Sequence, residues 1–343
     1  MGADSPEAAG GPAPYTDLTP GDVLDALDAV GLQGDGRLIQ LNSYENRVFQ
    51  IFLEGGRVVV AKFYRPGRWS DAQILEEHAF AAELVVGEIP VAAPIPLALD
   101  ARSPHVDAVA IAGATYRFGV TERRAGRAPE LEDPEVRRWL GRYIGRLHAV
   151  GAVAPFRHRM TLDVATYGEA SRDFLLAERL ISDDVADRWR GLAEQALAVC
   201  RDAFAAVSPR RIRLHGDCHP GNILWTDAGP HFVDLDDAVS GPAVQDLWML
   251  LSGDRASMSR QLLDVLEGYE SFMDFDWREL RLLEPLRTLR MLHHSAWIAR
   301  RWSDPTFPIN FPWFASPAYW ADQCTRLGEQ LEAMAEPPLG SPA

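Results

Sequence analysis

The dominant spacing of hydrophobic residues changes at about residue 126 of the 343-residue chain. Up to about residue 126, short apolar runs are separated by Gly, Pro and polar residues, a pattern typical of strands. The Glu54-Gly55-Gly56 connection predicts a tight hairpin between two of these runs. We expect an antiparallel sheet whose strands cover 37–42, 47–53, 57–64, 91–99, 109–113 and 115–122.

Helices are predicted on both sides of this boundary. In the first part, Thr19 and Gly31 are suited to begin and end a helix within 18–32, and residues 71–86 are rich in good helix formers. In the second part, apolar residues of 134–151 recur at i, i+3, i+4 and i+7, which indicates an amphipathic helix. We expect further helices over 170–206, 243–252, 257–274, 280–302 and 318–335, and one pair of strands at 222–225 and 231–236.

These elements predict a protein of the α+β class with two lobes. Residues 15–126 are expected to form an N-terminal lobe, with an antiparallel sheet and one main helix against it. Residues 127–335 are expected to form a mostly helical C-terminal lobe. Residues 1–14, rich in Ala, Gly and Pro, and residues 336–343 are expected to be disordered tails.

Charge and composition narrow the range of partners. The formal net charge of −15 repels nucleic-acid phosphates and anionic lipids, so we expect neither a nucleic acid nor a membrane as partner. No apolar run approaches the roughly 20 residues of a membrane helix, and the N-terminus lacks the features of a signal peptide. Cys200, Cys218 and Cys324 have no CxxC spacing, which fits a reducing compartment. We therefore expect a cytoplasmic protein.

The segment 213–225, RLHGDCHPGNILW, gathers polar side chains between apolar runs. His215 precedes Asp217 by two residues and Asn222 follows it by five, the spacing of the kinase catalytic loop. In that chemistry a carboxylate orients the attacking hydroxyl and accepts its proton, while an amide oxygen reaches the metal on the phosphates. The alternative is a zinc or iron site made by His215, Asp217 and His219, which Pro220-Gly221 disfavours because it interrupts an extended strand.

Two further segments fit the same template. The run FVDLDDA offers Asp234 as a second metal ligand, with Asp236 and Asp237 as competitors, and a solvated turn explains Asp237 best. Lys62 lies in the apolar run VVVAKFY, where its charge needs a partner. On the following helix we favour Glu77 over Glu76 as that partner, because Glu77 and Leu84 are two helical turns apart and can both face the sheet.

Two segments of the C-terminal half have structural interpretations. Asp246 either braces the catalytic loop from behind or is a plain acidic residue in a first helical turn. The run FPINFPWF at 307–314 is too rich in proline for a helix, and we expect it to pack over the C-terminal lobe near the substrate cleft. His293 and His294 are expected to be satisfied or exposed side chains and not ligands.

Together these motifs resemble the aminoglycoside phosphotransferase and choline kinase superfamily. More narrowly, LNSYENRVFQI, VAKFYRPGRWSDAQILEEHAFAAEL, RLHGDCHPGNILW and FVDLDDAVSGPAVQDLWMLL look like the bacterial stress response kinase A family. The resemblance implies a protein-kinase-like fold and a monomer that phosphorylates protein Ser or Thr with ATP and Mg²⁺ under envelope and oxidative stress. It also implies roles for Asp217 and Asp234 as catalytic residues, Asn222 and Asp234 as Mg²⁺ ligands, and Ser43, Lys62 and Glu77 as ATP-binding residues.

The chain also departs from ordinary protein kinases. LNSYENRV replaces the Gly-rich loop before Lys62, so backbone amides near Ser43, Glu45 and Asn46 are expected to cover the phosphates. Asp234 is followed by Leu235-Asp236 and not by Phe-Gly, and no A-P-E motif occurs after Asp234, so we expect no activation loop. A kinase of a small alcohol or amine shares every catalytic residue, and an inactive nucleotide-binding module is a third alternative. The negative net charge slightly favours a cationic acceptor.

Overall fold

The computed structural model of the protein describes residues 18–97, 107–111 and 114–340. The expected tail at 1–14 and the last residues, 341–343, lie outside the described residues. Within the expected C-terminal tail, Leu339 is 3% exposed and the Gly340 N–H donates to Ser259 Oγ at 3.4 Å. This part of the tail therefore packs against the C-terminal lobe.

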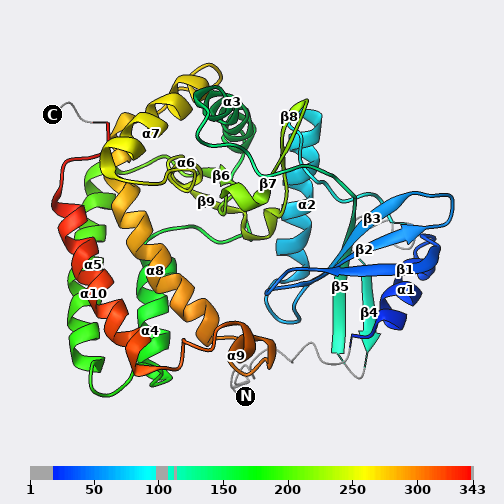
Figure 1. Cartoon of the computed structure of the whole chain (residues 1–343), viewed down its shortest axis with the longest axis horizontal. Coiled ribbons are helices and arrows are strands. Elements are labelled where there is room, and N and C mark those ends of the chain that lie inside the picture. The colour runs from blue at the N-terminus through cyan, green and yellow to red at the C-terminus, as the bar shows by residue number, and fades with distance from the viewer. Residues whose placement is uncertain (1–17, 98–106, 112–113, 341–343) are drawn as a thin grey trace, which may run out of the picture.

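An antiparallel sheet forms the N-terminal lobe. Its five strands lie in the order β1-β2-β3-β5-β4 (Figure 1) and comprise β1 (Gly34–Leu41), β2 (Arg47–Leu53), β3 (Val58–Phe63), β4 (Asp107–Ile111) and β5 (Ala114–Glu122). Along β3, Val59, Ala61 and Phe63 are buried with α1 (Pro20–Ala29) in one hydrophobic cluster. Because side chains alternate along a strand, Val60 and Lys62 face the other side, where α2 (Asp71–Val86) lies.

The strand predicted at 91–99 is wrong for its described part, 91–97. Only isolated bridges occur there, from Val91 to Phe232 and from Pro94 to Thr121. Pro90, Pro94 and Pro96 have no N–H to donate, and a continuous sheet ladder needs one at alternate residues. Residues 98–99 of this prediction lie outside the described residues. The segment instead runs from the end of α2 to the sheet and touches both lobes.

The C-terminal lobe is mostly helical, as predicted. Helices α5 (Ala186–Val207), α8 (Leu283–Ala299) and α10 (Pro317–Ala335) lie side by side, and α3 (Pro134–Gly151) packs against α7 (Arg255–Tyr269) (Figure 1). A Cβ atom at Gly141 of α3 would lie 2.0 Å from the Val265 carbonyl of α7, so only glycine allows this approach. The shorter α-helices of this lobe are α4 (Ala170–Ala177), α6 (Gln245–Trp248) and α9 (Thr306–Asn310). A π-helix at Val164–Glu169 precedes α4, and a 3₁₀-helix at Trp277–Leu282 precedes α8.

Three helix predictions need correction. The single range 170–206 is interrupted between α4 and α5, where Arg179 has a left-handed φ of 52°. The range 243–252 shrinks to the short helix α6. The prediction that 307–314 is not helical is wrong for α9, because Pro308 lies in its first turn, where the backbone N–H has no partner within the helix anyway.

Two small strand pairs lie between the lobes. The predicted pair is present as β7 (Ile223–Thr226) and β8 (Gly229–Phe232), but β8 ends before Asp234, whose φ of 60° breaks the strand. A second pair, β6 (Ile212–Leu214) with β9 (Val239–Gly241), was not predicted, since three residues are too few to show a period. In the part of the chain that the structure describes, no helix is both long and apolar enough to cross a bilayer.

Candidate active site

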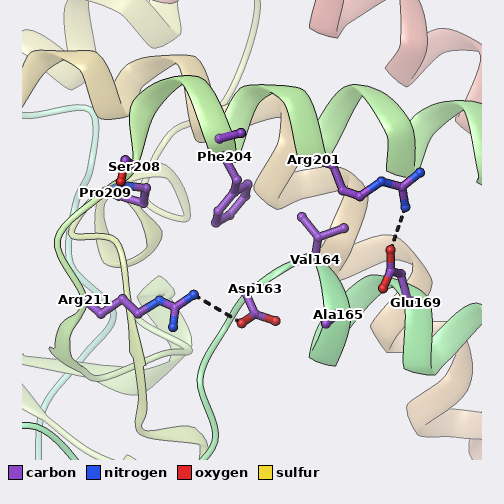
Figure 2. A pocket seen from close by; sticks show the side chains of 10 residues that line it. Asp163, Val164, Ala165, Glu169, Arg201, Phe204, Ser208, Pro209 and Arg211 are labelled. Carbon is purple, nitrogen blue, oxygen red and sulfur yellow. Dashed lines mark hydrogen bonds and ion pairs between the residues drawn. The ribbon is translucent and has the colours of Figure 1, made fainter.

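Two hollows in the structure differ in how their charges are arranged. One, of about 450 Å³, lies between α5 and the π-helix, where Arg201 binds Glu169 at 2.6 Å and Arg211 binds Asp163 at 3.4 Å (Figure 2). Its charged side chains thus satisfy one another. The other, of about 830 Å³, lies between the two lobes and has all six predicted site residues in its wall: Ser43, Lys62, Glu77, Asp217, Asn222 and Asp234. This cleft is the candidate active site.

Lys62 enters the cleft from β3 and meets Glu77 of α2. Lys62 Nζ lies 3.2 Å from Glu77 Oε1 and 3.3 Å from Asp236 Oδ1. Burial disfavours the charged ammonium, but the neighbouring carboxylates outweigh it and raise the pKa of Lys62 well above its ordinary value. Glu76 faces elsewhere and accepts the backbone N–H groups of 157–159 at 2.6 to 2.9 Å. The preference for Glu77 as the partner of Lys62 is confirmed.

Asp217 lies on the loop after β6 and is held on several sides. The Asn222 amide donates to the Asp217 carbonyl at 2.9 Å, and His219 Nε2 lies 3.5 Å from Asp217 Oδ2. Arg290 Nη2 lies 2.8 Å from Asp217 Oδ1. Burial opposes ionisation, but the hydrogen bond from His219 and the charge of Arg290 keep the pKa of Asp217 well below its ordinary value. Asp217 is therefore a carboxylate at neutral pH.

Asp246 braces this loop from behind. It is fully buried, and its two oxygens accept the backbone N–H groups of His215 and Gly216, each at 2.8 Å. His148 Nε2 lies 3.0 Å from Asp246 Oδ2 and fixes the carboxylate from α3. His215 Nε2 in turn donates to the Val233 carbonyl at 2.9 Å, one residue before Asp234. The bracing alternative for Asp246 is confirmed, and the loop is tied to the segment that carries Asp234.

The three acids after β8 have different surroundings. Asp234 has a 53% exposed side chain, and the pKa of its carboxyl rises to about 6 because the cleft desolvates it and, despite Lys62, Asp236 and Asp237 add negative charge. Asp236 is buried, accepts the Asn46 amide at 3.1 Å, and has a pKa kept low by Lys62 and Arg68 in spite of burial. Asp237 is not only a solvated turn residue, because Arg68 binds it at 2.5 Å.

The segment 42–46 takes the place of a Gly-rich loop. Ser43 Oγ accepts the Asn46 N–H at 3.3 Å, which closes a tight turn. Glu45 anchors the turn to the C-terminal lobe, because its carboxylate accepts the Trp297 indole N–H at 2.6 Å and pairs with Arg301 at 2.7 Å. Arg68 also pairs with Glu45. The turn is thus held over the cleft from both lobes.

The sequence interpretation named Asp236 only as a competing metal ligand and Asn46 only for its backbone amide, and it missed the hydrogen bond between their side chains. Asp236 and Asn46 link the acidic segment to the turn, and neither follows a known kinase spacing. Arg290 was missed because it lies 73 residues after Asp217. One signal was present: Arg290, His293, His294 and Trp297 all line the cleft and recur at i, i+3, i+4 and i+7 on α8.

A zinc or iron site at 215–219 is not supported. His215 is buried and bound to the Val233 carbonyl, so it does not converge with Asp217 and His219. Over the described ranges, no three His, Cys, Asp or Glu side chains form a group that could hold a metal by themselves. A magnesium ion bound with a nucleotide needs only one or two protein ligands. The hard oxygens of Asn222 and Asp234 fit such an ion, and the raised pKa of Asp234 indicates negative charge that a cation would neutralise.

Known proteins match this chain over nearly its whole length. The sequence profile of the Phosphotransferase enzyme family matches residues 37–283. Stress response kinase A of Escherichia coli (strain K12) is 43% identical over 331 residues, covering 95% of this chain and 96% of the relative. A Salmonella typhimurium protein named serine/threonine protein kinase RdoA is 44% identical over the same shares. In fold, the chain is similar to an amicoumacin kinase bound to AMP-PNP and Ca²⁺, with a TM-score of 0.69, 20% identity and coverage of 94% and 95%. The chain therefore belongs to the phosphotransferase enzyme family, among the stress response kinase A proteins.

Proposed function

We propose that this phosphotransferase is an ATP- and Mg²⁺-dependent kinase of protein Ser or Thr that acts in a bacterial stress response, as a monomer in the cytoplasm. The observation that carries the proposal is the identity of 43% to 44%, over 95% of the chain, with relatives named stress response kinase A and serine/threonine protein kinase. In this proposal residues 15–126 bind the nucleotide, and residues 127–335 supply the catalytic loop and bind the acceptor.

The phosphate-holding group is Lys62. Its ammonium, oriented by Glu77, binds phosphate oxygens of ATP, and the turn at Ser43 covers them from above. The positive charge is kept in place by two carboxylates, so it needs little reorganisation when the nucleotide binds.

Asp217 is the residue that faces the acceptor. Its carboxylate orients the attacking hydroxyl and accepts its proton as the new P–O bond forms and the bond to the leaving ADP oxygen breaks. Asn222 and Asp234 would hold Mg²⁺, which supplies positive charge to the transferring phosphoryl oxygens. Asp246 keeps Asp217 in register by fixing the backbone two residues before it.

A kinase of a small alcohol or amine is the second candidate. The similarity in fold to an amicoumacin kinase favours it, although at 20% identity that similarity concerns the fold alone. Lys62, Asp217, Asn222 and Asp234 would act in the same way in both enzymes, so these residues do not discriminate between the acceptors. Only the acceptor side of the cleft can do so.

The test is transfer of labelled γ-phosphate from Mg·ATP by the purified protein. Generic protein acceptors are compared with a panel of small alcohols and amines, and Asp217→Asn serves as the control. We expect label on Ser or Thr of protein, reduced in the variant by about 10² to 10⁴-fold, the usual contribution of a general base. Label on small molecules alone would establish the second candidate. ATP binding without any transfer would establish an inactive module.

A further inference from the structure

Arg290 lies at the acceptor end of the cleft, and its position indicates the charge of the acceptor. Arg290 projects from α8 beside Asp217, and its side chain is 41% exposed. His294 and Trp297 lie on the same face of α8, and His219 faces them from the catalytic loop. The group that receives the acceptor hydroxyl is thus bordered by a partly exposed cation.

Carboxylates that could attract a cationic acceptor are already paired at this end. Glu45 is bound by Arg301 and the Trp297 indole, and Asp237 is bound by Arg68 at 2.5 Å. The Trp297 ring is also occupied, because the Arg301 guanidinium lies 5.1 Å from its centre and His294 stacks on the same side chain. The local charges therefore disfavour a cation, although the net charge of the whole chain had slightly favoured one.

Both carboxylate oxygens of Asp217 have a polar neighbour before an acceptor binds, although Oδ1 has only an ion pair and accepts no hydrogen bond within the described residues. His219 and Asn222 approach Oδ2, and Arg290 pairs with Oδ1. His219 is fixed by the Gly221 N–H at 2.9 Å and Asn222 by the Asp217 carbonyl at 2.9 Å, whereas Arg290 is a long and partly exposed side chain. The incoming hydroxyl can therefore take Oδ1 most easily if Arg290 finds another anion.

We propose that the acceptor hydroxyl is flanked by a carboxylate, from Asp or Glu of the substrate protein, which binds Arg290 and so releases Asp217 for the hydroxyl. The inference rests on the proposed protein kinase function and adds the substrate class. Since one residue of extended chain spans about 3.3 to 3.6 Å, the carboxylate belongs within about two residues of the acceptor Ser or Thr. Arg290 is then a specificity-determining residue with a planar guanidinium suited to a carboxylate.

The test is a positional scan of Ser-centred peptides with the full-length protein and Mg·ATP. Each position from −4 to +4 carries Asp, Lys or Ala in turn, and kcat/KM is measured for the wild type, Arg290→Gln and Arg290→Lys. Arg326→Gln is the control, because it removes an exposed arginine from α10, where Arg326 pairs with Asp322. The readout is the ratio of kcat/KM for Asp over Ala, which does not depend on any general loss of activity in a variant.

We expect a ratio of about ten within two residues of the Ser, since one charge-assisted hydrogen bond changes affinity by roughly that factor. The ratio should fall to about one in Arg290→Gln, lie between these values in Arg290→Lys, and stay unchanged in Arg326→Gln. Peptide phosphorylation without an acidic preference, or with a raised KM for ATP as the sole effect of Arg290→Gln, would overturn the inference and leave the kinase function standing. Transfer to small alcohols alone would remove both.

Discussion

The charged side chains of the proposed nucleotide half of the cleft are buried, whereas those of the proposed acceptor half are partly exposed. In the nucleotide half, Lys62, Glu77 and Asp236 have side chains only 19%, 6% and 5% exposed, and they neutralise one another. In the acceptor half, Arg290 and His219 are 41% and 39% exposed and surround Asp217. In the proposed function, the nucleotide that all kinases share would meet a buried and prearranged site, whereas the variable acceptor would meet side chains that can still move.

The largest expected effect separates two acids of the nucleotide half. Asp234→Asn should lower kcat by about 10²-fold or more and raise the Mg²⁺ concentration that gives half-maximal activity. It should cost little in the free energy of unfolding, because the Asp234 side chain is half exposed. Asp236→Asn should cost on the order of 3 kcal/mol in the free energy of unfolding, because it weakens a buried pair with Lys62. Mg²⁺ titrations of activity and urea unfolding measure the two quantities. Full activity of the Asp234→Asn variant would indicate that Asp236, and not Asp234, is the metal ligand.

The pair of Lys62 and Glu77 tests whether stability and activity in this half can be separated. Lys62→Met should cost about 3 kcal/mol in the free energy of unfolding, since Glu77 and Asp236 lose a buried cation. It should also lower kcat/KM for ATP by about 10²-fold. Adding Glu77→Gln should restore part of the stability and none of the activity. Recovery of activity in the double variant would contradict the role of Lys62 in holding phosphate.

His293 offers a test of the acceptor half by pH. Burial and nearby arginines lower the pKa of His293 to about 3, while an unfolded histidine titrates near 6.5. The unfolded chain then binds more protons in this range, so stability is complete above pH 6.5 and falls as the pH falls towards 3.

We expect His293→Leu to remove about 1 to 2 kcal/mol of the stability loss between pH 6.5 and pH 5. Urea unfolding at several pH values measures it, and His158→Leu, at an exposed histidine, is the control. The prediction fails if the two variants lose stability in parallel with the wild type over this range.

The smallest effect compares neighbouring glutamates of α2. Glu76→Gln should cost about 1 kcal/mol in the free energy of unfolding, because three backbone N–H groups lose a charged acceptor. It should leave kcat within about twofold of the wild type, whereas Glu77→Gln should lower kcat/KM for ATP markedly. Steady-state kinetics with both variants decides this. Equal losses of activity in both variants would mean that activity depends on the placement of α2 and not on the Glu77 carboxylate.

The template residues were predictable because their chemistry fixes their spacing. Asp217 and Asn222 lie on one loop, and Lys62 needs a carboxylate on the next helix, so the two residues of each pair are close together in the sequence. Arg290 was not predictable in the same way. Its helical stripe on α8 could be read from the sequence, but nothing local indicates that this stripe faces Asp217. Strands β6 and β9 were equally hidden, since their pairing joins residues 212–214 to 239–241.

The sequence alone determined the class of the protein, the five strands of its main sheet, most of its helices and the residues that fit the kinase template, because periodicity and motif spacing are local properties. The tertiary structure alone decided which of three neighbouring acids is buried, that Asp246 supports the loop of Asp217, and that Glu45 ties the turn at 42–46 to the C-terminal lobe. These choices depend on burial and on charges brought together from distant segments. Only the folded chain places Arg290 against Asp217, so only the structure indicates the charge of the acceptor.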